Sequence, residues 1–223
     1  MRSFRPEDTA PCYRIGHIED DLRKGLSEGK KMIIGHIDFS NLQKVEIPEE
    51  YKLLTMFRHP AERIISTHLH FQKNDNPDYS TWKGGKVNFE EFMNSEFANN
   101  WYVQLLSGKK GLVPSDSDED ELLQLAQNNF KRLDWVGVSE RFEDSIFSLS
   151  IFMGRRLKNP GKFNEGGQPD EHFRLRGMYR PQLLVKNTSD ILIYQMALKE
   201  LDQQLNKVRF KNIRRGIFNL VSG

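Results

Sequence analysis

A strand-to-helix junction at residues 51–66 constrains the fold of this chain more than any other segment. The apolar run from Leu53 to Phe57 has the composition of a buried strand. Arg58 follows this run, Pro60 ends the strand, and the residues after Pro60 have the spacing of a helix. The start of a helix carries unpaired backbone N–H groups and partial positive charge, so we expect the junction to favour a phosphate.

Polar side chains at the junction offer further ligands to a phosphate. Arg58, Arg63 and Ser66 bring two guanidinium groups and a hydroxyl to the expected helix start. A guanidinium fork matches the geometry of phosphate oxygens. The sequence therefore predicts a phosphate site at Arg58 and Ser66, with Arg63 as a further anion contact. An ordinary strand–turn–helix with surface arginines is the alternative interpretation.

The remaining chain alternates between strand-like and helix-like segments. We expect strands at 32–39, 51–57 and 135–138, and helices at 19–27, 61–71, 89–93, 101–106, 122–133, 140–153 and 192–205. A polar N-terminal segment without a strand covers 1–31, a loop covers 158–171, and a basic tail covers 206–223. This alternation predicts an α/β fold, a parallel sheet flanked by helices, within a single domain spanning 1–223.

Composition limits the class of protein. The 223 residues carry a formal net charge of +2 and contain one cysteine, Cys12. No apolar run approaches the ~18 residues that a membrane span needs, so we expect no membrane partner. A lone cysteine indicates a reducing compartment, hence a cytoplasmic protein, with a luminal domain separated from its anchor as the alternative. The near-neutral charge argues against nucleic acid, and no Cys pair or His-Glu-x-x-His motif predicts a metal site.

The pattern Arg58-His-Pro-x-Glu-Arg63-x-x-Ser66 resembles the 3′-phosphate motif of sulfotransferases that use 3′-phosphoadenosine 5′-phosphosulfate (PAPS), heparan sulfate 2-O-sulfotransferases above all. In that family the first Arg and the Ser of the motif bind the 3′-phosphate. Further segments occur in the family's order, namely Gly35-His36-x-x-Phe39, Asn100–Gly108, Trp135–Arg141 and Asp190–Leu201. The resemblance implies a P-loop-NTPase-like core, PAPS as co-substrate without a metal, and sulfuryl transfer to a hydroxyl of a carbohydrate or other alcohol.

His36 is the candidate catalytic base. Sulfuryl transfer needs a group that removes the proton of the acceptor hydroxyl, and histidine suits this role near neutral pH. In the 2-O-sulfotransferases the His of the equivalent Gly-His pair is the base, and a second His stands two residues earlier, where this chain has Ile34. A core histidine is the alternative for His36. Strand alternation would put Asp38 on the same face as His36, where it could orient the imidazole or bind substrate. The alternative is that Asp38 is only a polar residue at the end of the strand.

One part of the family pattern is missing. These enzymes hold the phosphosulfate with a loop, Pro-Lys-x-Gly-[Ser/Thr]-[Ser/Thr], between the first strand and first helix. The most similar segment, Arg23–Ser27, lacks a preceding strand and a following apolar helix. We therefore expect a core without its first strand, loop and helix. Three interpretations stay open. The chain is truncated, it is completed by another chain, or it is a non-catalytic relative that binds a nucleotide or an anionic glycan. The basic run Lys207–Arg215 could attract such a glycan. A kinase would need a phosphate loop and magnesium ligands, and neither is evident.

Overall fold

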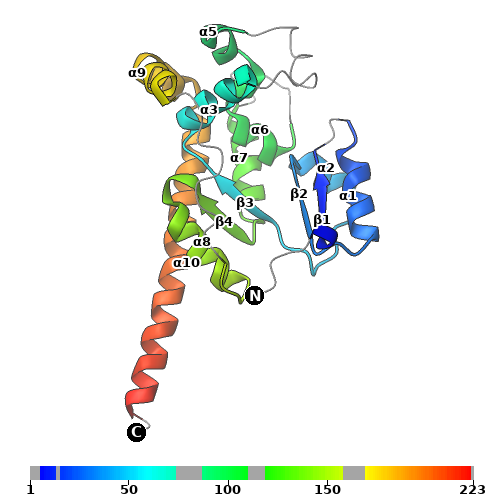
Figure 1. Ribbon diagram of the computed structural model, residues 1–223, viewed down its shortest axis with the longest axis vertical. Helices are drawn as coiled ribbons and strands as arrows, with labels where there is room; N and C mark the ends of the chain where they lie inside the picture. Colours follow the sequence, from blue (N-terminus) through cyan, green and yellow to red (C-terminus); the bar gives the residue numbers. More distant parts are fainter. Residues whose placement is uncertain (1–5, 14–15, 74–86, 110–118, 158–168, 222–223) are drawn as a thin grey trace. The chain divides into compact units, whose positions relative to one another are not determined.

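The computed structural model describes residues 6–13, 16–73, 87–109, 119–157 and 169–221 (Figure 1). The chain divides into two compact units, each made of two chain segments. Unit 1 comprises Met1–Leu53 and Asn100–Asp134, and unit 2 comprises Leu54–Asn99 and Trp135–Gly223. The single domain over 1–223 stays a prediction, and the two units are described in turn.

Unit 1 begins with a strand–helix–strand arrangement. Strand β1 (Thr9–Cys12) is followed by helix α1 (Ile18–Ser27) and then by strand β2 (Met32–Gly35). The two strands are parallel, in a register that runs from Thr9 opposite Met32 to Cys12 opposite Gly35. The prediction of no strand ahead of residue 32 is therefore wrong. Thr-Ala-Pro-Cys is too short to give a strand pattern and contains a proline, which is rare in strands, so its pairing with β2 decides its conformation.

Further helices of unit 1 lie before and after this arrangement. They are η1 (Pro6–Asp8), α2 (Phe39–Lys44), α6 (Trp101–Ser107) and α7 (Glu119–Phe130), and α6 contacts both α7 and α2. Cys12, Leu22 and Val45 form the buried centre of a cluster between the strands, α1 and α2. The segment Arg23–Ser27 lies inside α1 and is not a loop, which agrees with its rejection as a phosphosulfate loop.

Unit 2 contains the predicted strand-to-helix junction. Strand β3 (Leu54–Phe57) is parallel to β4 (Trp135–Val138), and Phe57 lies opposite Val138 at the end of the ladder. All four β4 residues are buried. Helices α8 (Phe142–Phe152) and α10 (Thr188–Val221) contact β4, and the short helix η3 (Ser139–Arg141) joins β4 to α8 (Figure 1).

A second group of helices completes unit 2. It consists of α3 (Pro60–Lys73), α5 (Phe89–Met93), η2 (Glu96–Ala98) and α9 (Pro169–Lys186). Ile64 and Ile65 of α3, Phe92 of α5, and Leu175 and Leu183 of α9 are buried in one cluster. Helix α9 was not predicted. Its first residues fall in the expected loop 158–171, of which 158–168 lie outside the described residues.

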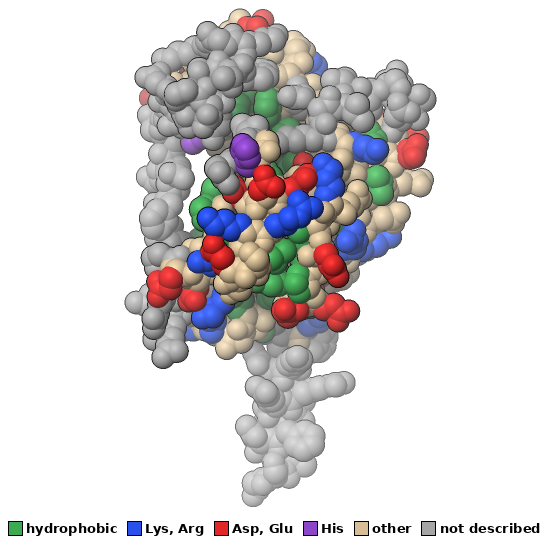
Figure 2. Space-filling view, turned by 90° about the vertical axis from the view of Figure 1, so that its right-hand side faces the viewer, with side chains coloured by type: hydrophobic (Ala, Val, Ile, Leu, Met, Phe, Trp, Pro, Cys, Tyr) green, Lys and Arg blue, Asp and Glu red, His purple; other side chains and the backbone are tan. Residues whose placement is uncertain are grey.

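The fold is thus mixed α/β, with parallel strand pairs flanked by helices, as the sequence predicted. The described strands form two two-stranded sheets, β1–β2 and β3–β4, where one sheet was expected. The strands expected at 32–39 and 51–57 do not pair with each other, because β2 pairs with β1 and β3 pairs with β4, and β2 already ends at Gly35. Within the described ranges, no helix has the length and apolar character to cross a membrane. Figure 2 shows cations and carboxylates intermixed on the face turned to the viewer, in keeping with the low net charge.

Candidate functional site

The junction between β3 and α3 carries the predicted phosphate ligands. Arg58 is the first residue after β3 and is partly exposed. Pro60 is the first residue of α3, a position that suits proline because its fixed φ is helical and its missing N–H would have no intrahelical partner there. Local sequence therefore sets the geometry in which Arg58 leaves the end of the strand.

Backbone N–H groups at this junction are less available than the sequence suggested. The N–H of His59 donates to Oε1 of Glu140 at 2.9 Å, and the N–H of Arg63 donates to the carbonyl of His59 at 2.9 Å. Pro60 has no N–H, and Ala61 is fully buried. An anion at this place would depend mainly on guanidinium groups, which corrects the expectation of free backbone donors.

Arg63 and Ser66 lie one turn apart on α3 and are both partly exposed. Nη1 of Arg63 donates to the carbonyl of Phe97 at 2.9 Å, so this side chain joins α3 to η2. Arg63 therefore has a structural contact in addition to its predicted role. Ser66 is placed on the turn that follows, and its role as a phosphate ligand stays a prediction.

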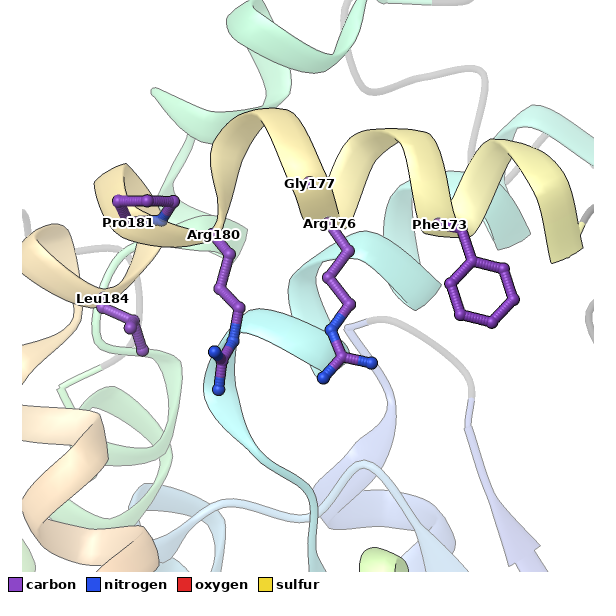
Figure 3. Close-up of a pocket in the computed structure, with 6 residues that line it drawn as sticks. All are labelled: Phe173, Arg176, Gly177, Arg180, Pro181 and Leu184. Carbon is purple, nitrogen blue, oxygen red and sulfur yellow. The ribbon is translucent and has the colours of Figure 1, made fainter.

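Helix α9 adds two arginines that the sequence reasoning missed. Arg176 and Arg180 are four residues apart, and Figure 3 shows both side chains extending from α9 in the same direction. Nε of Arg176 lies 3.1 Å from Oε1 of Glu62, in the first turn of α3. Burial lowers the pKa of His59, and the charge of Arg180 lowers it further.

The same face of α9 borders an open hollow of about 490 Å³. Figure 3 shows the ring of Phe173 beside the two arginines, and Phe173 is 66% exposed. A Cβ atom at Gly177 would meet no atom within 4 Å, so the surface of α9 is open at this position. The lining residues are Phe173, Arg176, Gly177, Arg180, Pro181 and Leu184.

The junction keeps an excess of positive charge. Four arginines, 58 and 63 at the junction and 176 and 180 on α9, outnumber the two carboxylates of Glu62 and Glu140. Nε2 of His172 lies 3.3 Å from Oε2 of Glu62. Burial lowers the pKa of His172, Glu62 opposes this shift, and the charge of Arg58 adds to it. His172 is therefore a mainly neutral group at physiological pH, and the arginines supply the attraction for an anion.

His36, the candidate base, belongs to unit 1 and directly follows β2. It is exposed, so the interpretation as a core histidine does not apply. Its backbone N–H donates to the backbone carbonyl of Cys12 at 3.2 Å, and its ring packs edge-on against Tyr13 with ring centroids 5.4 Å apart. Any side chain at Gly35 would collide with that Cys12 carbonyl, which explains the glycine before His36.

Asp38 has a structural use at the start of α2. Because β2 ends at Gly35, strand alternation does not place Asp38 on the face of His36. Its Oδ1 instead accepts from the N–H of Asn41 at 3.0 Å and from Oγ of Ser40 at 2.6 Å, as the N-cap of α2. Asp38 is buried, and substrate binding by this residue stays a prediction.

The structure thus brings Arg58, Arg63 and Ser66 together in unit 2, and His36 and Asp38 together in unit 1. Among the described side chains, no group of three or more His, Cys, Asp or Glu residues could hold a metal ion. No family model, curated protein or solved structure matches this chain. Chemically, the β3–α3 junction has the charge and donor set to bind a phosphomonoester. The exposed imidazole of His36 has the accessibility that a proton acceptor needs.

Proposed function

We propose that the chain is a PAPS-dependent sulfotransferase that transfers a sulfuryl group to a hydroxyl of a carbohydrate or other alcohol. In this proposal the β3–α3 junction binds the cofactor's 3′-phosphate. One observation carries it: Arg58 leaves the end of a parallel strand at a helix start that Arg176 and Arg180 also approach from α9. Arg58 is also the first residue of the sequence motif that resembles the family.

The positive charge of the β3–α3 junction suits a phosphomonoester as the ligand. A 3′-phosphate carries close to two negative charges at neutral pH, and guanidinium groups bind it with paired, charge-assisted hydrogen bonds. His59 and His172 lie beside the arginines with lowered pKa values, so the arginines provide the fixed positive charge. The P-loop-NTPase-like core is the finer part of the proposal, and the parallel pair β3–β4 with α3 after β3 supports it.

His36 is the proposed base. In the transfer step the imidazole accepts the proton of the acceptor hydroxyl, whose oxygen forms a bond to sulfur. The bond between sulfur and the bridging phosphate oxygen breaks, and adenosine 3′,5′-bisphosphate leaves with that electron pair. Exposure of His36 at the carboxyl end of a parallel strand supports this role, because ligands of α/β proteins bind at that end of the strands.

A non-catalytic protein that binds a nucleotide or an anionic glycan is the second candidate. The nearest match to the phosphosulfate loop, Arg23–Ser27, is helical. The junction between β1 and α1 is also unfavourable for an anion, because Glu19, Asp20 and Asp21 occupy the first turn of α1. A binding protein of this kind would keep the β3–α3 site without turnover.

Calorimetry with adenosine 3′,5′-bisphosphate tests the phosphate site. We expect Arg58→Ala to weaken binding by about 10- to 100-fold, because a charged hydrogen bond contributes ~1.5–3 kcal/mol. Ser66→Ala should cost less, since a neutral hydroxyl bond contributes about 0.5–1.5 kcal/mol. His36→Ala should leave the affinity nearly unchanged. Adenosine 5′-monophosphate is the matched ligand control, because it lacks the 3′-phosphate and should not distinguish wild type from Arg58→Ala.

Two outcomes would decide against the assignment. Equal affinity of wild type and Arg58→Ala, or no binding by a folded wild-type protein, would contradict the assignment of the 3′-phosphate site.

Transfer of label from ³⁵S-PAPS to a panel of glycans separates the two candidate functions. Turnover that His36→Ala abolishes supports the sulfotransferase, and binding without turnover supports the non-catalytic protein.

A further inference from the structure

The ladder between β3 and β4 is continued by a side chain. The last paired residues are Phe57 and Val138, and beyond them the chain turns into η3 on one side and α3 on the other. Glu140, two residues past β4, directs Oε1 to the N–H of His59, two residues past β3, at 2.9 Å. The carboxylate therefore takes the place that a strand carbonyl would have in a longer ladder.

The second oxygen of Glu140 is also engaged. The hydroxyl of Tyr194, on α10, donates to Oε2 at 3.0 Å. Tyr194 is only 8% exposed, and its ring packs edge-on against the ring of His59 with centroids 5.4 Å apart. Glu140 thus connects the residue after Arg58 to a buried side chain of α10, and the position of this carboxylate is fixed from two directions.

We propose that Glu140 is a positioning residue for Arg58, with Tyr194 as its support, an inference that rests on the proposed 3′-phosphate site. Phe57, before Arg58, is fixed by the strand ladder, and the N–H of His59, after it, is fixed by Glu140. The backbone of Arg58 is therefore held on both sides, which fixes the direction in which its side chain leaves the chain. Such preorganisation lowers the entropy lost when an anion binds.

The sign of the effect separates positioning from simple electrostatics. A carboxylate beside an anion site repels the ligand, so removal of its charge alone should tighten binding. Removal of the His59 contact should weaken binding, because the turn that carries Arg58 is released. Glu140→Gln removes the charge but keeps an oxygen that can accept from His59, whereas Glu140→Ala removes both. Glu143→Ala is the matched control, because Glu143 is an exposed carboxylate in the first turn of α8.

The test is calorimetric titration of full-length variants with adenosine 3′,5′-bisphosphate and, in parallel, adenosine 5′-monophosphate. We expect Glu140→Ala to weaken the bisphosphate about five- to tenfold and Tyr194→Phe about two- to threefold. Glu140→Gln and Glu143→Ala should bind as well as wild type or more tightly. The monophosphate should not distinguish the variants, whereas a general loss of structure would affect both ligands.

A ligand-free readout accompanies the titration. Amide hydrogen exchange at His59 should become faster in Glu140→Ala and stay slow in Glu140→Gln. If wild type binds the bisphosphate and Glu140→Ala binds it equally well or more tightly, the positioning role is overturned and the phosphate site stands. If wild type does not bind, the proposed function falls and the positioning role falls with it. Should Glu140→Ala not fold, Tyr194→Phe decides, and unchanged affinity in that variant overturns the inference.

Discussion

His68 shows at the residue scale how burial sets the charge of a side chain. It is 6% exposed and packs between Phe89 and Phe92, with ring centroids 5.1 and 5.3 Å away. Its Nδ1 has no hydrogen-bond partner among the described residues. Burial lowers the pKa of His68, and the charge of Glu171 opposes this shift only in part. The imidazole is therefore neutral in the folded protein at pH values where it is partly protonated in the unfolded chain.

This difference predicts a loss of stability in mild acid. Below the ordinary value of 6.5, the unfolded chain takes up a proton at His68 that the folded protein does not. The free energy of unfolding should therefore fall as the pH drops through 6.5 towards the lower folded pKa. Burial acts in the same direction on His59 and His172. His68→Phe should flatten the dependence without abolishing it, as measured by urea unfolding at pH 8 and pH 5.5. An identical pH dependence in the variant would contradict this account.

At the element scale, α2 depends on its cap because it has only six residues. Asp38 and Asn41 form a reciprocal capping box, in which each side chain accepts from the backbone N–H of the other. We expect Asp38→Ala to lower the free energy of unfolding by about 1 kcal/mol, and Asp38→Ser, which retains a capping oxygen, to lose much less. Urea unfolding measures both.

The same pair of variants tests the predicted substrate contact of Asp38. If the residue acts only as a cap, Asp38→Ser should retain both stability and the proposed sulfuryl transfer. A stable Asp38→Ser protein that has lost transfer would instead indicate that the carboxylate meets the substrate. Equal stability of Asp38→Ala and wild type would argue against the capping role.

At the scale of the whole molecule, the predicted phosphate ligands and the candidate base belong to different units. Binding of adenosine 3′,5′-bisphosphate should stabilise the folded state by about 2.7 kcal/mol at a ligand concentration of 100 Kd. We expect the slowing of amide hydrogen exchange to be largest in α3 and α9 of unit 2, and to be smaller in Arg58→Ala at the same ligand concentration. Protection in β1 and α1 with none in α3 would place the ligand elsewhere and contradict the proposal.

Local chemistry was sufficient to predict most elements from the sequence. The apolar run before Arg58 predicted β3, the helical spacing after Pro60 predicted α3, and the short run Trp135–Val138 predicted β4, with only small shifts at the ends of β3 and α3. These segments carry their signal in adjacent residues, because strand alternation and helix starts are short-range effects. The positions of Arg58 and Ser66 at the start of one helix follow from the same local information.

Tertiary contacts decided the rest. Gly177 and Pro181 weaken the helical pattern of α9, and the buried residues Leu175 and Leu183, eight apart, identify it only once they pack against α3. Strand β1 has four residues, one of them Pro11, and gives no strand pattern before it pairs with β2. Arg176 and Glu140 could not be assigned to the junction from the sequence either. Each is brought there by packing between segments far apart in the sequence, which no local pattern records.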